Sequence, residues 1–424
     1  MQAVILSAGY GRRLYPLTED KPKSLIKVAG KELLLRHLQL LNENGIDEFI
    51  IVTNNMYKSK IEEFINRTPY NVKLVVNPEP ERGNASSLYY ARDFVKDTFV
   101  LVMSDHIYER SFVEEAVKGK GIIVDELARF VDHEESTKVL CVGGKVTDIG
   151  KNIERWNCYD TGFFVLDKKI LEHLEWLMKE KRVVEMSELV RKAQIECTHV
   201  SGMFWMDIDT PEDIEKAKKI LIERSVKGTG DGFVSRYLNR KISTKITEVV
   251  IDNLTPMKAT FISFFIGLLS SVVALVFPPL GGIFYQISSI LDGIDGEISR
   301  ASLSTSKFGG WLDSILDRYV DFTFLTALAI HLSPSLHMLP VVLFAMFGSF
   351  MVSYSTERYK GEYGKDIYRT IGLMKFLPGK RDERIFFIMI MTILGYIWEM
   401  FIILAIITNL RVLATIIAVK VNDR

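Results

Sequence analysis

Cysteine and glutamine are scarce in this chain of 424 residues. Its three cysteines, Cys141, Cys158 and Cys197, have a spacing that matches neither a zinc site nor a disulfide framework. We therefore expect buried thiols in a reducing compartment. Only four glutamines accompany the abundant Lys, Arg and Glu, which favours a thermophilic source.

Excess charge of either sign is also lacking, since 53 basic residues balance 53 acidic ones. The chain therefore has no global basic field of the kind that attracts nucleic acid, and we expect no nucleic-acid partner. The N-terminus lacks a basic segment followed by a long apolar one, because Met1 leads directly into a short strand and a Gly-rich turn. We expect the first half of the chain to stay in the cytoplasm.

The composition divides the chain into two parts. Up to about Glu223 it is charged and mixed, and apolar runs alternate with amphipathic segments. The patterns predict strands at 2–6, 48–53, 72–76 and 98–103, and helices at 31–44, 57–66 and 86–96. Strands that alternate with helices predict an α/β domain, Rossmann-like, with a mostly parallel sheet covered on both faces. We place this domain at residues 1–228.

From Met257 onward, long apolar runs predict an all-α polytopic membrane domain at 257–424. About 20 apolar residues cross a bilayer, and segments 257–277, 280–300, 309–331 and 336–356 fit. Segment 384–420 is long enough for two short or tilted helices with a turn near Glu399. The total is six transmembrane helices.

A linker at 229–256 joins the two domains. Apolar residues recur at helical spacing between Arg and Lys over 229–253, which predicts a helix lying on the membrane surface. An ordinary linker helix packed on protein is the alternative.

The distribution of basic residues predicts the orientation in the membrane. Eight Lys and Arg lie in the loop 357–384, whereas the turns at 278–282 and 332–340 have none. The positive-inside rule places that loop, residues 301–308 and the C-terminus in the cytoplasm. We therefore expect a multi-pass protein of the cell membrane whose active sites both face the cytoplasm.

Four aspartates occur where the second and third predicted spans meet. Asp292 and Asp295 share one helix face, and Asp313 and Asp317 share another. Ionised Asp in a membrane helix is costly, and a divalent cation offsets that cost. Such hard oxygen ligands suit Mg²⁺, with Mn²⁺ as an alternative, and two cations can hold a pyrophosphate for in-line displacement.

These residues resemble the signature of the CDP-alcohol phosphotransferases, Asp-x-x-Asp-Gly-x-x-Ala-Arg followed by Gly-x-x-x-Asp-x-x-x-Asp. Ser299 replaces the usual Ala, and the resemblance covers roughly 230–424. It implies a CDP-alcohol donor and CMP as leaving group. The implied metal ligands are Asp292, Asp295, Asp313 and Asp317, with Asp317 as the alternative base. Gly296, Arg300 and Gly309 would hold the CMP part, and Lys375, Lys380, Arg381 and Arg384 are candidates for the acceptor phosphate. Members of the family are often dimers through the membrane domain, which implies a homodimer.

The first part opens with a Gly-rich loop directly after its first strand, and such loops offer backbone N–H groups to phosphate. The loop is neither a Walker A motif nor a dinucleotide fingerprint. Instead Arg13 and Lys23 follow, two cations suited to a triphosphate. Asp105 ends a predicted strand, and Asp207 and Asp209 offer further Mg²⁺ ligands. This set suits nucleotidyl transfer, in which charge builds on the α-phosphate and pyrophosphate.

The Leu-x-Ala-Gly-x-Gly-x-Arg-Leu pattern with Pro-Lys over about 1–222 resembles the sugar-phosphate nucleotidyltransferases. The resemblance implies catalytic roles for Arg13 and Lys23 and a cation held by Asp105 with Asp207, Asp209 or both. It implies a nucleotide site at Leu6, Ala8, Gly9, Gly11, Lys23, Gly83 and Asn84. It implies contacts to the substrate phosphate and alcohol from Lys151, Asp160, Gly162 and Glu185. Lys151, Asp160 and Glu185 are equally compatible with ordinary surface positions.

The two halves together resemble the family of bifunctional inositol-1-phosphate cytidylyltransferases and di-myo-inositol-phosphate-phosphate synthases of hyperthermophiles. That resemblance implies CTP, inositol 1-phosphate and CDP-inositol as substrates and intermediate, and a compatible solute as product. A phospholipid synthase is the main alternative for the membrane half. A transporter with a nucleotide-sensing domain predicts ionisable groups spread along several spans, whereas here they cluster at one depth. A catalytically inactive first domain is disfavoured because Arg13, Lys23 and Asp105 are all present.

Overall fold

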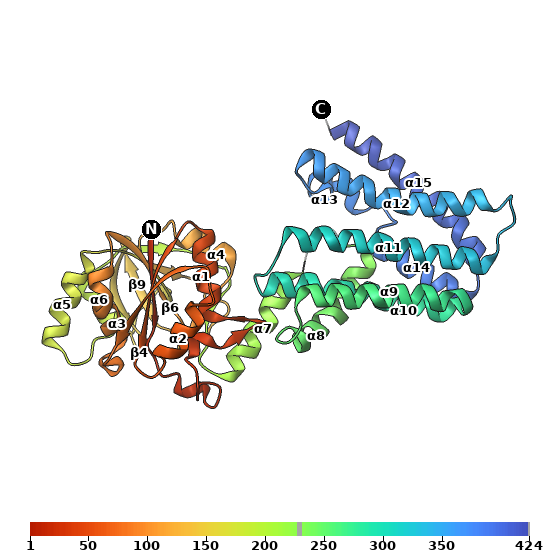
Figure 1. Ribbon diagram of the computed structural model, residues 1–424. Coiled ribbons are helices and arrows are strands. Elements are labelled where there is room, and N and C mark those ends of the chain that lie inside the picture. Colours follow the sequence, from red (N-terminus) through yellow and green to blue (C-terminus); the bar gives the residue numbers. More distant parts are fainter. Residues whose placement is uncertain (227–230, 423–424) are drawn as a thin grey trace. The chain divides into compact units, whose positions relative to one another are not determined.

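The computed structural model describes residues 1–226 and 231–422, which form two compact units, Met1–Lys218 and Lys219–Arg424 (Figure 1). The first is an α/β unit and the second is helical. All seven strands and helices predicted within the first 103 residues are present.

A nine-stranded sheet forms the centre of the first unit. Its strands run in the order β10–β9–β11–β6–β1–β4–β5, with β8 paired to β11 and β12 paired to β8. Their bounds are β1 (Gln2–Ser7), β4 (Glu48–Asn54), β5 (Asn71–Asn77), β6 (Thr98–Met103), β8 (Gly121–Asp125), β9 (Lys138–Val142), β10 (Lys145–Gly150), β11 (Cys158–Asp167) and β12 (Cys197–His199). Two small sheets pair β2 (Lys27–Val28) with β3 (Lys31–Glu32) and β7 (His106–Tyr108) with β13 (Trp205–Asp207).

Helices cover both faces of this sheet, so its central strands are buried throughout. The helices are α1 (Leu33–Glu43), α2 (Lys58–Ile65), α3 (Asn84–Ala91), α4 (Arg110–Ala116), α5 (Ile170–Glu180), α6 (Met186–Ala193) and α7 (Pro211–Ser225). Along β1, Val4 and Leu6 join the core under α3, α5 and α6, while Ile5 faces the other side, where α1 and α4 lie (Figure 1). Alternation with burial on both faces is what a continuous apolar strand predicts.

The prediction of a mostly parallel sheet is wrong, because the sheet is mixed. β1, β4, β5 and β6 run parallel to one another, but β11 runs antiparallel to β6, β8 and β9. The cause is the segment after β8, where β9 and β10 form a hairpin closed by Gly143-Gly144 and β11 returns beside them. The early βα repeats carry no information about this hairpin.

The expectation of three free thiols is also wrong. Cys141 in β9 and Cys197 in β12 form a disulfide with their Cα atoms 6.5 Å apart, and Cys158 remains a buried thiol. Edge strand β10 brings the two together, since its residue Lys145 forms a bridge with Glu196. This proximity arises from tertiary packing over a separation of 56 residues, which local spacing does not encode.

Within residues 231–422, the second unit contains six main α-helices and two shorter ones, α8 and α13. Residues 235–239 form a π-helical turn that continues into α8 (Arg240–Val250). The main helices are α9 (Pro256–Val276), α10 (Pro278–Ala301), α11 (Lys307–Leu332), α12 (Leu339–Tyr363), α14 (Arg381–Leu394) and α15 (Ile397–Asn422), with the short α13 (Ile367–Thr370) before α14. α9 packs between α10 and α11, and α12 packs along α15 (Figure 1).

Three helices among the described residues are long and apolar enough to cross a membrane, namely α9, α12 and α15. α10 and α11 contain the aspartates of the predicted site. α14 has 14 residues, about 21 Å of helix at 1.5 Å per residue, which is shorter than a bilayer core.

Two details of the predicted boundaries differ from the structure or lie outside it. The turn expected near Glu399 lies at Gly395 and Tyr396, because Gly395 adopts a left-handed conformation that ends α14. The expected boundary at 228/229 and the first residues of the linker helix fall within 227–230, outside the described residues.

Candidate active sites

A cavity of about 510 Å³ lies at the carboxyl ends of β1 and β6, where parallel strands commonly present ligand-binding loops. The predicted nucleotide-site residues surround it. Its lining includes Leu6, Ala8, Gly9, Gly11, Arg13, Lys23, Gly83, Asn84, Asp105 and Asp209.

Lys23 is held between two carboxylates at the floor of this cavity. Its Nζ lies 3.2 Å from Asp105 and also contacts Asp209, while Arg13 lies 3.1 Å from Asp209. Burial lowers the pKa of Lys23, but the charges of Asp105 and Asp209 outweigh burial and raise that pKa above its usual value. Lys23 is therefore a fixed positive charge at the place predicted for a triphosphate.

A second cavity of about 440 Å³ adjoins the first. Lys151, Asp160, Gly162 and Asp207 line it, and the two cavities share Asn84, Asp105 and Glu185. All the residues predicted to contact the alcohol phosphate therefore border one space beside the nucleotide cavity. Burial raises the pKa of Asp160 to about 6.

His106 is a site residue that the sequence did not reveal. Its Nδ1 lies 2.9 Å from Asp105, and burial, which raises the pKa of Asp105, is outweighed by Lys23 and His106, which hold that pKa well below its usual range. Gly162, at φ 68°, fits against the ring because a Cβ there would lie 2.7 Å from it. A single histidine after a strand offered no pattern from which to infer this contact.

Gly83 and Asn84 contact residues 184–186 where the two cavities adjoin. A Cβ on Gly83 would lie 2.3 Å from the carbonyl oxygen of Val184, so only glycine fits. The Asn84 backbone N–H donates to Glu185 at 3.2 Å, and Asn84 Oδ1 accepts from the Met186 N–H at 2.7 Å. The cavity wall is thus fixed by contacts across a hundred residues of sequence.

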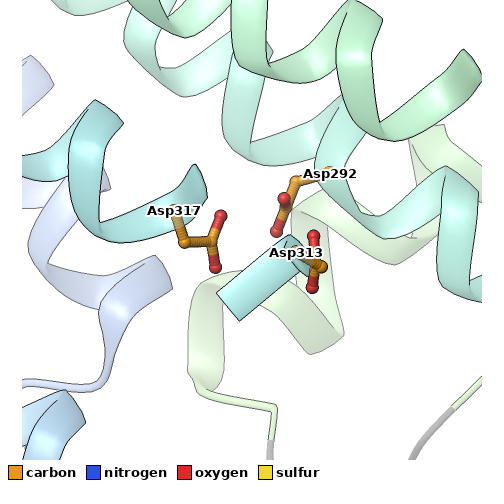
Figure 2. A group of neighbouring side chains, drawn as sticks. All are labelled: Asp292, Asp313 and Asp317. Carbon is orange, nitrogen blue, oxygen red and sulfur yellow. The ribbon is translucent and has the colours of Figure 1, made fainter. Parts of the chain in front are cut away.

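In the helical unit, α10 and α11 bring three aspartates together. Asp292 projects from α10 and Asp313 and Asp317 from α11, and their carboxylates face a common space (Figure 2). One oxygen of each lies within 4.8 Å of the others. Three hard oxygen donors at this spacing can hold a divalent cation.

The remaining motif residues lie around this group. Asp295 accepts a hydrogen bond from Thr260 of α9 and lies outside the group of three. Arg300 folds back over Gly296, where a Cβ would lie 2.8 Å from its Nη1, and its Nε donates to the Ser225 carbonyl. Gly309 donates its N–H to Ser306 Oγ at the start of α11.

A polar cavity of about 230 Å³ adjoins Asp292 and Asp317. Three of the four basic residues predicted for the acceptor phosphate, Lys380, Arg381 and Arg384, line it, whereas Lys375 is exposed and does not. Arg318, which the sequence analysis did not single out, lines it as well. Among the described buried atoms, Arg318 Nη1 and Arg384 Nη2 have no hydrogen-bond partner.

Glu297, one residue after Gly296, is a second residue whose contacts the sequence did not reveal. Its side chain is fully buried and accepts from Ser243 at 2.6 Å, Thr247 at 2.7 Å and Arg240 at 3.2 Å. Arg240 also pairs with Asp231 at 2.9 Å. These bonds attach α8 to the helix that carries the aspartate motif.

A larger cavity of about 1160 Å³ opens between α11 and α12 on another side of the aspartates. Asp313 and Asp317 line its inner end. Five aromatic residues line it, together with polar and charged residues such as Arg318 and Glu357, and the five are Trp311, Tyr319, Phe322, Phe350 and Tyr354.

Comparison with known proteins gives a family for each part of the chain. Residues 2–224 match the nucleotidyl transferase family model, and residues 252–419 match the CDP-alcohol phosphatidyltransferase model. Both families typically use divalent metals.

Relatives extend this match over the whole chain. A "bifunctional IPC transferase and DIPP synthase" of Aquifex aeolicus is 54% identical, with 98% of this chain and 97% of the relative covered. Proteins of the same name from Thermococcus kodakarensis and Archaeoglobus fulgidus are 48% and 46% identical, covering 98% and 100% of this chain and 96% and 85% of theirs. The first unit is also similar to a solved inositol-1-phosphate CTP transferase from T. maritima at 27% identity and TM-score 0.46, covering 50% of this chain and 90% of that one.

Proposed function

This chain belongs to the family of bifunctional IPC transferases and DIPP synthases, and on that basis we propose two successive transfers. The first unit converts CTP and inositol 1-phosphate to CDP-inositol and pyrophosphate. The helical unit then transfers the inositol phosphate group of CDP-inositol to a second inositol 1-phosphate, giving di-myo-inositol phosphate phosphate, a compatible solute, and CMP. The observation that carries this proposal is the 54% identity over 98% of the chain to a protein of that double name.

We assign residues 1–228 to the cytidylyltransferase, 229–256 to a linker that includes α8, and 257–424 to the phosphotransferase. The two family models support this division, since one ends at residue 224 and the other begins at 252.

In the cytidylyltransferase, the phosphate oxygen of inositol 1-phosphate forms a bond to the α-phosphorus of CTP, and the α–β bridge bond breaks. Arg13 and Lys23 neutralise the departing pyrophosphate from the cavity floor, where both are already paired with Asp209. Gly83 and Asn84 border the nucleotide, and Lys151, Asp160, Gly162 and Glu185 border the alcohol phosphate. Asp105 lines both cavities and, with Asp207 or Asp209, would hold Mg²⁺.

In the phosphotransferase, a hydroxyl of the acceptor forms a bond to the β-phosphorus, and the bond to CMP breaks. Asp292, Asp295, Asp313 and Asp317 would hold Mg²⁺, which supplies charge neutralisation for the pyrophosphate. Asp317 is the cluster carboxylate that lines both the polar cavity and the cavity between α11 and α12, so we assign it the proton of the attacking hydroxyl. Gly296, Arg300 and Gly309 would hold the CMP part.

The acceptor phosphate belongs in the polar cavity beside this cluster. Arg318 and Arg384 each keep a buried N–H group without a hydrogen-bond partner there, and burying unpaired donors is costly unless a ligand satisfies them. Lys380 and Arg381 complete the set. Lys375 does not line this cavity and is not part of the proposed phosphate site.

We further propose a multi-pass domain of six transmembrane helices, five long ones and the short α14, with both active sites on the cytoplasmic side. The basic loop between α12 and α14 and the apolar character of α9, α12 and α15 support this orientation. A homodimer through the membrane domain remains our expectation for the oligomeric state.

One observation favours a second candidate, a phospholipid synthase. The cavity between α11 and α12 is lined by Asp313 and Asp317 and by five aromatic residues, and a lipid-linked substrate needs apolar surface of this kind beside the site. The polar cavity with its buried arginines favours a soluble phosphorylated acceptor, and for this reason we place the lipid reaction second.

Phosphorus NMR of the detergent-solubilised protein with CTP, Mg²⁺ and inositol 1-phosphate tests the proposal. We expect equal amounts of pyrophosphate, CMP and phosphodiester, two inositol 1-phosphates consumed per CTP, no reaction in Lys23→Ala, and wild-type rates in the exposed control Lys27→Ala. If CDP-inositol accumulates in wild type without phosphodiester and added CDP-diacylglycerol or lipid is consumed, the lipid reaction replaces the second step.

A further inference from the structure

Arg381, the first residue of α14, lies between two carboxylates of the aspartate cluster. Its Nη1 is 3.1 Å from Asp292 and 3.0 Å from Asp317. These are two of the three residues whose oxygens converge on one space. The guanidinium therefore supplies the positive charge that these carboxylates would otherwise receive from a cation.

The other side of the guanidinium is fixed by Asp321, one turn after Asp317 on α11. Arg381 Nε donates to both oxygens of Asp321, at 3.1 and 3.2 Å, and Asp321 also accepts from the Tyr285 hydroxyl at 2.8 Å. Asp321 is outside the cluster of three. It can hold Nε while the Nη groups change partners.

The polar cavity beside Asp292 and Asp317 offers a second set of partners for Arg381. Arg318 and Arg384 line it with Arg381, and each of these two keeps a buried donor without a hydrogen-bond partner. Both also lie within 4 Å of Asp321. An anion bound there would meet three guanidinium groups gathered around one carboxylate.

We propose that Arg381 is a positioning residue that couples binding of the divalent cation to binding of the acceptor phosphate, with Asp321 as its pivot. Paired in this way, Arg381 neutralises Asp292 and Asp317. A cation at those oxygens repels the guanidinium, and a phosphate in the polar cavity attracts it, so each ligand favours the other. The inference rests on the proposed function of the helical unit, because it takes the polar cavity as the acceptor-phosphate site.

Mn²⁺ binding, followed by electron paramagnetic resonance of the full chain in detergent, tests this coupling with inorganic phosphate as the second ligand. All proteins carry Asp105→Asn to remove the cation site of the first unit, and Asp313→Asn identifies the Mn²⁺ that belongs to the cluster. We expect saturating phosphate to raise Mn²⁺ affinity about tenfold, within the usual range of coupling between sites. Because coupling is reciprocal, Mn²⁺ should raise phosphate affinity by the same factor.

Arg381→Gln should bind Mn²⁺ several-fold more tightly than wild type without phosphate, since its competitor is gone, and phosphate should change that affinity less than twofold. Asp321→Asn, which keeps every cluster carboxylate, should lose the phosphate enhancement as well. Arg358→Gln, which removes an exposed arginine of α12 paired with Glu362, should behave as wild type.

Weaker or unchanged Mn²⁺ binding in Arg381→Gln, or a phosphate enhancement equal to that of wild type, would overturn the proposal. The proposal would also be overturned if phosphate did not raise Mn²⁺ affinity in the full chain that carries Asp105→Asn alone. None of these measurements involves CTP or an alcohol phosphate, so failure of the coupling and failure of the proposed reactions are distinguishable.

Discussion

Replacing Glu297 with glutamine should loosen α8 from α10 without disturbing the first unit. The fully buried carboxylate accepts three hydrogen bonds, from Arg240, Ser243 and Thr247. Hydrogen bonds to a charged group contribute about 1.5–3 kcal/mol each, and neutral ones about 1 kcal/mol. Glutamine keeps the shape and one oxygen, and Arg240 keeps Asp231 at 2.9 Å. The expected loss is therefore about 3 kcal/mol, below the roughly 5 kcal/mol that unpaired removal of a buried charge can cost.

Hydrogen exchange of the α8 amides, read by mass spectrometry, measures this loss locally in a chain of two units. A loss of about 3 kcal/mol corresponds to about a hundredfold faster exchange. Glu248→Gln, on the same helix but only partly buried, should change exchange little. Cytidylyl transfer serves as an internal control and should keep its wild-type rate. An increase below about threefold in Glu297→Gln would refute the reasoning that these bonds hold α8 in place.

Two further predictions concern the first unit. Cys197→Ser opens a disulfide that closes a loop of 56 residues, so this unit should lose about 4 kcal/mol of stability in the chain-entropy model, measured by denaturant unfolding against Cys158→Ser. Gly162→Ala should drive its Cβ against His106 and sharply reduce cytidylyl transfer, measured by pyrophosphate release. Gly143→Ala should leave the rate unchanged, because Gly143 has a similar positive φ but open space around it. Equal rates in the two variants would contradict the contact with His106.

Local patterns predicted the elements near the sites well. The predicted strand 98–103 has the same bounds as β6. Asp105 follows it at the edge of the sheet where Lys23 also lies. The helical spacing of Asp313 and Asp317 correctly places both on one face of α11, facing Asp292 (Figure 2). In each case the information resides in a few consecutive residues or in helical periodicity.

The remaining features depend on contacts between distant segments. The disulfide of Cys141 with Cys197 and the antiparallel course of β11 both result from how β8 to β12 assemble, which no local period encodes. Asp321 follows Asp317 at the same helical interval, so its place beside the site could have been inferred. Its role in gathering Arg381 and Arg384 could not, because α12 and α13 separate α14 from α11 along the chain.

The most direct test of the two-step reaction uses two variants, Lys23→Ala and Asp317→Asn, first separately and then mixed, with CTP, Mg²⁺ and inositol 1-phosphate. Lys23→Ala alone should leave CTP unused, and Asp317→Asn alone should accumulate CDP-inositol and pyrophosphate without CMP. The mixture should form the phosphodiester, because each variant keeps the site that the other lacks. Release of CMP and phosphodiester by Asp317→Asn alone at the wild-type rate, or formation of CDP-inositol by Lys23→Ala alone, would contradict the assignment of one reaction to each unit.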